Sequence, residues 1–228
     1  LTPGTLITDG SIFGEHAKGI AENTLIVFTS DNGPWIRFEN DASHPKYDEA
    51  RILVGSAFPF RDGKGSTWEG GVRVPGVFYW PGTIKPATVV RQPASTFDIL
   101  PTIFALAGEP RPSGRTLDGR DIRFHFDNQT WTTTPGEFSF IYTGSGANDI
   151  YGARKGAFKL HTRLYSQTGN NYGFTASRSN PILFNVETDP HERFDISGSN
   201  AAVVSELDTI ISNFETSVNT EKIFWDNP

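Results

Sequence analysis

The sequence contains no cysteine and no methionine among its 228 residues. Without cysteine there is no disulfide framework and no cysteine-based zinc site, so thiols give no indication of the redox compartment. Without methionine the chain does not start at an initiator residue. The first segment, Leu1 to Ala21, also has poor helix propensity. These two features together suggest a fragment or a processed chain.

An excess of positive charge and long hydrophobic runs are missing as well. The formal net charge is −6, which leaves no basic stripe and argues against nucleic acid as a partner. No apolar stretch approaches the roughly 20 residues of a membrane span, and the amino end has no charged start followed by an apolar signal segment. A chain of 228 residues is nevertheless long enough for one or two domains with a sizeable core.

A short apolar run, Thr24 to Phe28, is followed by the polar and turn-forming residues Thr29 to Pro34. Such a run predicts a buried strand of an α/β sheet. Ligands of these sheets bind beyond the carboxyl ends of the strands, where Asp31 and Asn32 offer neighbouring oxygens suited to Ca²⁺ or Mg²⁺. These residues alone leave open a plain surface turn with side-chain hydrogen bonds to the backbone.

A second motif, GKGSTWEGGVRVP, occupies residues 63–75. Its glycines let the backbone and the cationic side chain of Lys64 approach an anion such as sulfate or phosphate closely. An exposed loop lysine is the commoner case for this residue type. The glycines between Glu69 and Arg73 argue against a helix, and hence against a helical ion pair between these two residues. Both are interpreted as structural.

Three motifs resemble, in the same order, those of the formylglycine-dependent sulfatases: VFTSDNGP (27–34), the glycine-rich motif at 63–75, and STFDILPTIFALAG (95–108). The closest resemblance is to the arylsulfatase A and N-acetylgalactosamine-6-sulfatase group, and a weaker one extends over almost the whole chain. It implies an α/β, alkaline-phosphatase-like fold. Residues 1–110 would form the carboxy-terminal part of the main domain, with the end of its large mixed sheet, and residues 111–228 a smaller α+β subdomain.

Periodicity and turn signals predict the elements of both parts. A strand is expected within 72–80, and a helix within 95–108, with Ser95, Thr96 and Asp98 as candidate caps and Gly108 as its stop. Beyond a linker-like stretch at 109–121, the pattern predicts a small antiparallel sheet covered by a helix. Its strands are expected at 138–142, 150–154, 157–164 and 181–186, and its helix at 201–218.

The resemblance also implies a chemistry. Sulfatases of this family hydrolyse sulfate esters with a formylglycine made from cysteine or serine, which acts beside a bound Ca²⁺. Asp31 and Asn32 match two of the metal ligands, and Lys64 matches the catalytic lysine that contacts the substrate sulfate. The other acidic ligands, the nucleophile and its arginine find no match. One Ca²⁺ would therefore share its ligands with missing upstream residues.

The leading hypothesis is the carboxy-terminal part of a sulfatase for aryl or carbohydrate sulfates, inactive alone and partnered by the amino-terminal portion of the same sulfatase. The alternative is a non-catalytic, sulfatase-like extracellular protein with a structural or carbohydrate-binding role. A zinc phosphatase or phosphodiesterase of the same superfamily is disfavoured, because Asn32 stands where a histidine ligand would be expected.

Three further features bear on the hypothesis. Asn128 begins an Asn-Gln-Thr glycosylation acceptor, which with the resemblance indicates a secreted or lysosomal glycoprotein. His44 lies in a loop, Trp35 to Gly55, that would contribute to substrate choice, and it is interpreted as solvated. His161 is interpreted as structural. The sequence identifies neither the sulfate ester nor the oligomeric state. A homodimer is one of the states compatible with it.

Overall fold

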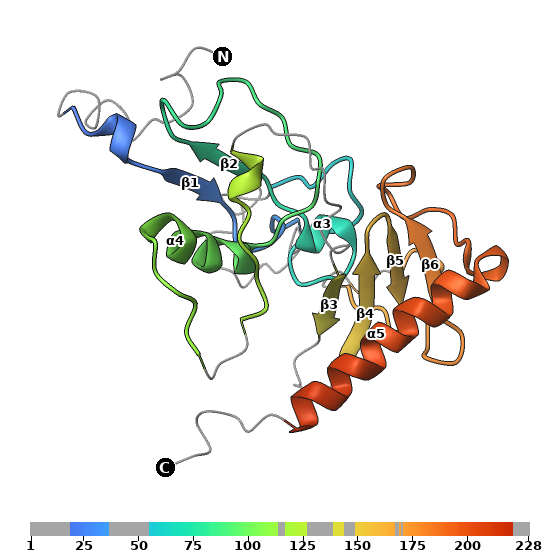
Figure 1. Ribbon diagram of the computed structural model, residues 1–228. Helices are drawn as coiled ribbons and strands as arrows, with labels where there is room; N and C mark the ends of the chain where they lie inside the picture. The colour runs from blue at the N-terminus through green and yellow to red at the C-terminus, as the bar shows by residue number, and fades with distance from the viewer. Residues whose placement is uncertain are drawn as a thin grey trace, which may run out of the picture. The chain divides into compact units, whose positions relative to one another are not determined.

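The computed structural model describes residues 19–36, 55–113, 117–126, 139–143, 149–166, 169 and 171–220. The chain divides into two compact units, each discontinuous in sequence (Figure 1). Unit 1 comprises Leu1–Asp31 and Pro75–Pro135, and unit 2 comprises Asn32–Val74 and Gly136–Pro228. The expected domain division between residues 110 and 111 stays a prediction.

Unit 1 contains a two-stranded antiparallel sheet. Strand β1 (Ile26–Thr29) pairs with strand β2 (Gly76–Tyr79) over four residue pairs, from Ile26 opposite Tyr79 to Thr29 opposite Gly76. Both strands form where the sequence predicted them, with β1 extending one residue further to Thr29, because each is a short β-branched and aromatic run that turn-forming residues end. A short 3-10 helix, Ala21–Asn23, precedes β1.

The side chains of β1 are less buried than its apolar run predicted. Phe28 and Val77 are cross-strand partners and are 59% and 50% exposed. Side chains alternate between the two faces of a strand, so the neighbouring pair, Val27 and Phe78, points to the opposite face. That pair lines a cavity together with a helix of the same unit. Among the described residues, β1 is thus covered on one face instead of being fully buried.

Helix α4 (Ile99–Ala107) forms the other wall of that cavity, whose volume is about 440 Å³. It is preceded by the 3-10 helix Thr96–Asp98, which has the predicted cap. The hydroxyl of Ser95 accepts a hydrogen bond from the Phe97 N–H, and the carboxylate of Asp98 accepts one from the Ser95 N–H. The helix ends at Gly108, whose φ of 71° is left-handed, a conformation that favours glycine. A further 3-10 helix covers Arg123–His125.

Unit 2 contains the predicted antiparallel sheet, with its strands in chain order: β3 (Ser139–Thr143), β4 (Ile150–Lys155), β5 (Phe158–His161) and β6 (Ile182–Asn185). The turn between β4 and β5 passes through Gly156, whose φ is 55°, and joins the two strands as a hairpin.

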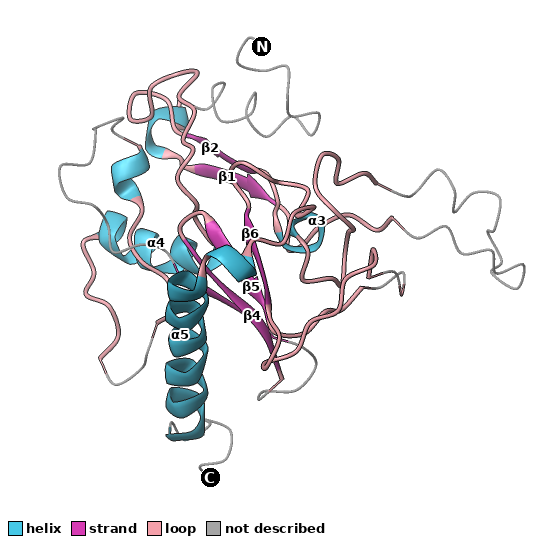
Figure 2. Cartoon of the chain, turned by 90° about the vertical axis from the view of Figure 1, so that its right-hand side faces the viewer, coloured by secondary structure: helices cyan, strands magenta, loops and turns pink. Residues whose placement is uncertain are grey.

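Helix α5 (Ala201–Thr220) lies along this sheet (Figure 2) and follows the 3-10 helix Ser197–Ser199. Leu207 and Ile211 of α5 are buried against Ala153, Leu160 and Leu183 of the strands. Burying each such leucine or isoleucine side chain contributes about 1.5–3 kcal/mol. The prediction that one apolar face of this helix covers the sheet is therefore confirmed.

Unit 2 also contains a helix that the sequence argued against. Residues Glu69–Val72 form the short helix α3, and Arg73 lies 3.6 Å from the carboxylate of Glu69. The prediction of no helix and no ion pair is wrong. Gly70 and Gly71 lower intrinsic helix propensity, but tertiary contacts of the buried Glu69 side chain and of the glycine backbone outweigh that preference.

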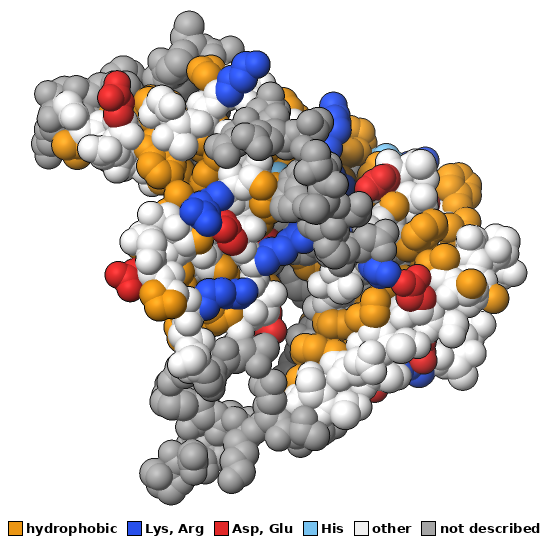
Figure 3. All heavy atoms as spheres, viewed as in Figure 1, with side chains coloured by type: hydrophobic (Ala, Val, Ile, Leu, Met, Phe, Trp, Pro, Cys, Tyr) orange, Lys and Arg blue, Asp and Glu red, His pale blue; other side chains and the backbone are white. Residues whose placement is uncertain are grey.

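Hydrophobic side chains also reach the surface on the face seen in Figure 3. None of the helices in the described part of the chain is long and apolar enough to cross a membrane.

Candidate active site

The structure brings Asn32 and Lys64 onto adjoining segments of unit 2. Lys64 lies in a loop that we call the Lys64 loop (Arg61–Arg73), and it is exposed. Its backbone N–H donates a hydrogen bond to the carbonyl oxygen of Pro34 at 2.8 Å, and the N–H of Gly33 donates to the carbonyl oxygen of Gly71 at 2.9 Å. These two hydrogen bonds hold the segment that begins at Asn32 against the Lys64 loop.

Close backbone packing explains the glycines of both motifs. A Cβ atom on Gly33 would lie 1.8 Å from the carbonyl oxygen of Gly70. One on Gly70 would lie 2.2 Å from that of Asp62, and one on Gly71 would lie 2.2 Å from that of Ser66. No side chain fits at such distances, since carbon and oxygen atoms in contact stay more than about 3 Å apart. The glycines are therefore needed to pack the loops together, whatever ligand the site takes.

Replacing Gly33 with alanine tests this packing. We expect Gly33→Ala to lower the free energy of unfolding by about 1–3 kcal/mol, because the methyl group forces backbone shifts in two tightly packed segments. Gly198→Ala is the matched control, since a Cβ there meets nothing within 4 Å. Denaturant unfolding of both variants measures the difference. Equal effects of the two substitutions would contradict the packing argument.

The first segment of unit 1 ends at Asp31, and unit 2 begins at the next residue, Asn32. Asp31 is exposed, and one of its carboxylate oxygens accepts a hydrogen bond from the Ser30 hydroxyl at 3.3 Å. Carboxylate and amide oxygens fit a hard cation such as Ca²⁺, which takes about six to eight oxygen ligands. Two residues supply only part of that set, and among the described residues no group of three or more His, Cys, Asp or Glu side chains is arranged so that it could hold a metal ion.

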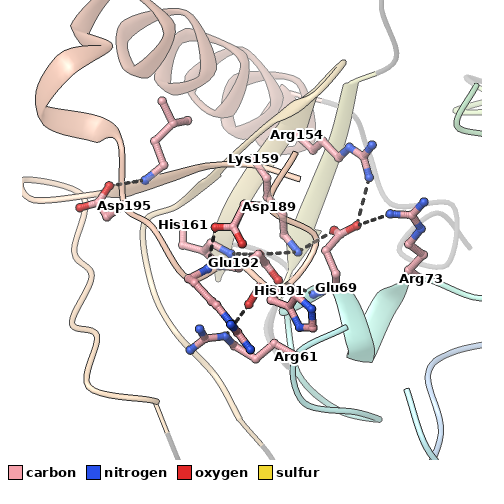
Figure 4. Close-up of polar contacts among 12 residues, drawn as sticks. Arg61, Glu69, Arg73, Arg154, Lys159, His161, Asp189, His191, Glu192 and Asp195 are labelled. Carbon is pink, nitrogen blue, oxygen red and sulfur yellow. Dashed lines mark hydrogen bonds and ion pairs between the residues drawn. The ribbon is translucent and has the colours of Figure 1, made fainter. Parts of the chain in front are cut away.

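The sequence did not predict the group of buried charges that attaches the Lys64 loop to the rest of unit 2 (Figure 4). It consists of Glu69, Lys159 and Glu192, each 0% exposed, and we call it the buried charge cluster. The ammonium nitrogen of Lys159 lies 3.0 Å from a carboxylate oxygen of Glu69 and 3.2 Å from one of Glu192. The backbone N–H of Glu69 donates a hydrogen bond of 2.6 Å to the other carboxylate oxygen of Glu192.

Further groups complete the hydrogen bonding of the two carboxylates. Arg154, on β4, donates to the second carboxylate oxygen of Glu69 at 3.3 Å. Nε2 of His161, on β5, lies 2.8 Å from Glu192, and the histidine is 1% exposed. The interpretation of His161 as a satisfied structural histidine agrees with this burial and pairing. The ring of Tyr142 lies 4.7 Å from the Lys159 ammonium.

The cluster sets the protonation states of its members. Burial alone would lower the pKa of Lys159, but the carboxylates of Glu192 and Glu69 outweigh it and raise that pKa above its ordinary value. Burial would raise the pKa of Glu192, but Lys159 and the hydrogen bond from His161 lower it to about 2. Burial lowers the pKa of His161. At neutral pH Lys159 and Glu192 are therefore charged, and the neighbouring His161 is neutral.

These shifts predict that acid destabilises unit 2. Unfolded His161 gains a proton below its ordinary pKa of 6.5 while the folded residue resists, so stability begins to fall there. The contribution of Glu192 is complete above its ordinary pKa of 4.5 and is lost as the pH falls through about 2. We expect the free energy of unfolding, measured with urea, to decrease steadily from neutral pH to about pH 3. His161→Gln should flatten only the upper part of this curve, and a flat curve in the unchanged protein would contradict the assignment.

An aromatic pocket holds the beginning of the Lys64 loop. The guanidinium of Arg61 lies 4.8 Å from the ring centroid of Trp68 and 4.6 Å from that of Tyr172. Its Nε donates a hydrogen bond of 2.8 Å to the carbonyl oxygen of His191. Trp68 is fully buried, in a cluster with Ile182, Phe184 and Val186. Arg61 and Trp68 thus anchor the loop in unit 2, while Lys64 between them stays exposed.

His44, Asn128 and positions 37–54 of the predicted specificity loop lie outside the described residues. Glu192, in the Asp-Pro-His-Glu turn at 189–192, is one of the buried carboxylates.

Comparisons with known proteins place these motifs in context. Residues 13–109 match the family model described as Sulfatase. Human steryl-sulfatase is 31% identical over an alignment of 190 residues, and the match covers 76% of this chain and 31% of that protein. Human arylsulfatase A is 32% identical over an alignment of 199 residues, and the match covers 83% of this chain and 36% of that protein. The chain spans about a third of the length of these curated relatives.

A solved sulfatase structure is also similar to this chain in its fold. The PsFucS1 sulfatase from Pseudoalteromonas sp. superposes with a TM-score of 0.69 at 26% identity, covering 93% of this chain and 41% of that one. This match confirms the expected alkaline-phosphatase-like α/β fold, with its small antiparallel sheet and carboxy-terminal helix.

Proposed function

Residues 13–109 of the chain belong to the sulfatase family, and on that premise we propose that the chain is the carboxy-terminal part of an enzyme that hydrolyses aryl or carbohydrate sulfate esters. The observation that carries this proposal is the pair of backbone hydrogen bonds, Lys64 to Pro34 and Gly33 to Gly71, which joins the Asp-Asn-Gly-Pro motif to the Lys64 loop. A short span relative to the curated relatives supports a nucleophile, a formylglycine, outside these 228 residues.

In this proposal Asp31 and Asn32 bind the metal ion, and Lys64 binds the substrate. Asp31 and Asn32 supply oxygen ligands to one Ca²⁺, whose remaining ligands come from the amino-terminal portion of the same protein. The ion, when bound, supplies positive charge to the sulfate oxygens. The exposed ammonium of Lys64 contacts the sulfate and stabilises the negative charge that develops as the ester bond breaks.

The proposal extends to where the protein works. A glycosylated Asn128 fits a secreted or lysosomal route, and the chain alone is expected to be inactive because it lacks a nucleophile. The proposal also includes a homodimer, which size-exclusion chromatography with light scattering tests.

Mass spectrometry of the native material tests the central claim. We expect peptides upstream of Leu1 that include a formylglycine, and release of sulfate from 4-nitrophenyl sulfate that chelation of calcium abolishes and added calcium restores. The 228-residue chain alone serves as the matched control and should release none. An unmodified residue at the nucleophile position, together with retained binding of a sulfated glycan, would overturn the enzymatic proposal. It would support the non-catalytic, carbohydrate-binding alternative.

A further inference from the structure

The buried charge cluster has no direct part in the proposed chemistry, because Lys159 and both carboxylates have no exposed surface in the described structure. It nevertheless joins the Lys64 loop to β5 and to the turn that contains Glu192. We propose that Glu69, Lys159 and Glu192 form a positioning device that holds the Lys64 loop, and through it the segment at Asn32, in one fixed arrangement. Its consequence for catalysis rests on the proposed sulfatase function.

The composition of the Lys64 loop explains why it needs such a device. Four of its thirteen residues, from Arg61 to Arg73, are glycine. Glycine loses more conformational freedom on ordering than any other residue. Trp68 is the one large apolar side chain of the loop that is fully buried. A loop with so little apolar anchorage keeps a single geometry only if other contacts restrain it.

Glu69 provides these restraints directly after Trp68. Its backbone N–H binds Glu192, one carboxylate oxygen binds Lys159, and the other binds Arg154. These contacts come from three separate parts of unit 2: the turn at 189–192, β5 and β4. Glu69 therefore cannot shift without breaking several charge-assisted hydrogen bonds, which are about twice as strong as neutral ones.

The restraint passes from Glu69 to the site residues through backbone hydrogen bonds. The N–H of Gly70 donates to the carbonyl oxygen of Arg61 at 2.8 Å and closes the loop. The carbonyl oxygen of Gly71 accepts from Gly33, the second residue after Asp31. A displacement of Glu69 thus moves both the loop that carries Lys64 and the segment that carries Asn32.

A contribution to stability alone does not explain why charged residues, and not apolar ones, occupy the buried charge cluster. Well-packed apolar residues of similar volume often stabilise a protein core as well as a buried ion pair does, or better. What an ion pair adds is direction, because its hydrogen bonds are satisfied only at one distance and orientation. The cluster therefore suits the fixing of a loop better than the strengthening of a core.

Hydrogen exchange tests the positioning role in the full natural protein. Glu69→Gln keeps the size of the side chain and its backbone N–H but removes the charge that pairs with Lys159. We expect amide exchange in peptides covering Gly33 and Gly70 to become at least about tenfold faster, with exchange in β5 and β6 unchanged. Glu206→Gln, at a partly exposed ion pair with Lys155 in the same unit, is the matched control. It should leave the Lys64 loop unchanged.

A second control separates positioning from general destabilisation. Leu207→Ala removes a buried side chain of α5 and should accelerate exchange across the sheet more than in the loop. In steady-state assays with 4-nitrophenyl sulfate, Glu69→Gln should lower kcat/KM about tenfold per folded molecule, while Leu207→Ala should not. Loop exchange as slow in Glu69→Gln as in Glu206→Gln would overturn the positioning proposal, even with sulfatase activity present. Absence of activity in the unchanged protein would overturn the proposed function and leave the exchange result to decide the positioning role.

Discussion

Replacing Lys159 with methionine should lower the free energy of unfolding by about 3–5 kcal/mol, the cost of removing one partner from a buried ion pair. Without Lys159 the carboxylates of Glu69 and Glu192 lose the cation that lies within 3.2 Å of both. Methionine has a similar length and fills the same space, so the loss measures the unpaired charges more than a cavity. Equilibrium unfolding in urea, followed by tryptophan fluorescence, measures it, since Trp68 is buried beside the cluster.

The matched control is Lys155→Met on the neighbouring strand. Lys155 forms an ion pair with Glu206 of α5, and both side chains are partly exposed. Pairs of this kind contribute less than about 1 kcal/mol. A second variant, Lys159→Met combined with Glu192→Gln, should be more stable than Lys159→Met alone, because one stranded charge is removed with its partner. Equal losses for Lys155→Met and Lys159→Met would show that the buried cluster contributes no more than a surface pair.

Elements of the fold that depend on neighbouring residues were predictable from the sequence. The cap of the 3-10 helix before α4 is one example, because the Ser95 hydroxyl binds the Phe97 N–H and the Asp98 carboxylate binds the Ser95 N–H within one turn. The apolar face of α5 is another, since Leu207 and Ile211 recur at helical spacing. In both cases the signal and the structure lie within the same few residues.

Features that depend on distant residues were not predictable. Glu69 forms an ion pair with Lys159, which lies 90 positions later in the sequence, and no periodicity in the sequence indicates such a contact. The same tertiary contacts overcame the glycines and produced α3. The exposure of Phe28 was missed for a related reason, because a local apolar run shows that a strand forms but not whether both of its faces are covered.

The residues of the candidate site were predictable from the sequence, but the contacts that hold them in place were not. The sequence and its family resemblance named Asp31, Asn32 and Lys64, and these assignments stay predictions. The structure adds the hydrogen bonds by which Gly33 and Lys64 join their two segments. It also gives the reason for the glycines: Gly33 packs against the distant backbone of Gly70, and Gly70 and Gly71 pack against the backbone of their own loop.

Replacing Lys64 with alanine in the full natural protein should lower kcat for 4-nitrophenyl sulfate by about 100- to 1,000-fold, the usual cost of removing one group that stabilises transition-state charge. Stability should change by less than about 0.5 kcal/mol, because the Lys64 side chain is exposed and its backbone N–H, which bonds Pro34, is retained. Lys64→Arg keeps the charge but presents it as a planar fork, and we expect it to recover only part of the activity.

Lys85→Ala is the control for loss of an exposed positive charge, since Lys85 is an exposed lysine of unit 1 outside the proposed site. It removes the same net charge and should leave both kcat and KM unchanged. Inhibition by inorganic sulfate gives an independent measure, because a lysine that contacts the sulfate group also contributes to binding of the free anion. If Lys64→Ala and Lys85→Ala behaved alike in both assays, Lys64 would be an ordinary surface lysine. The glycines around it would then serve only the packing of the two segments.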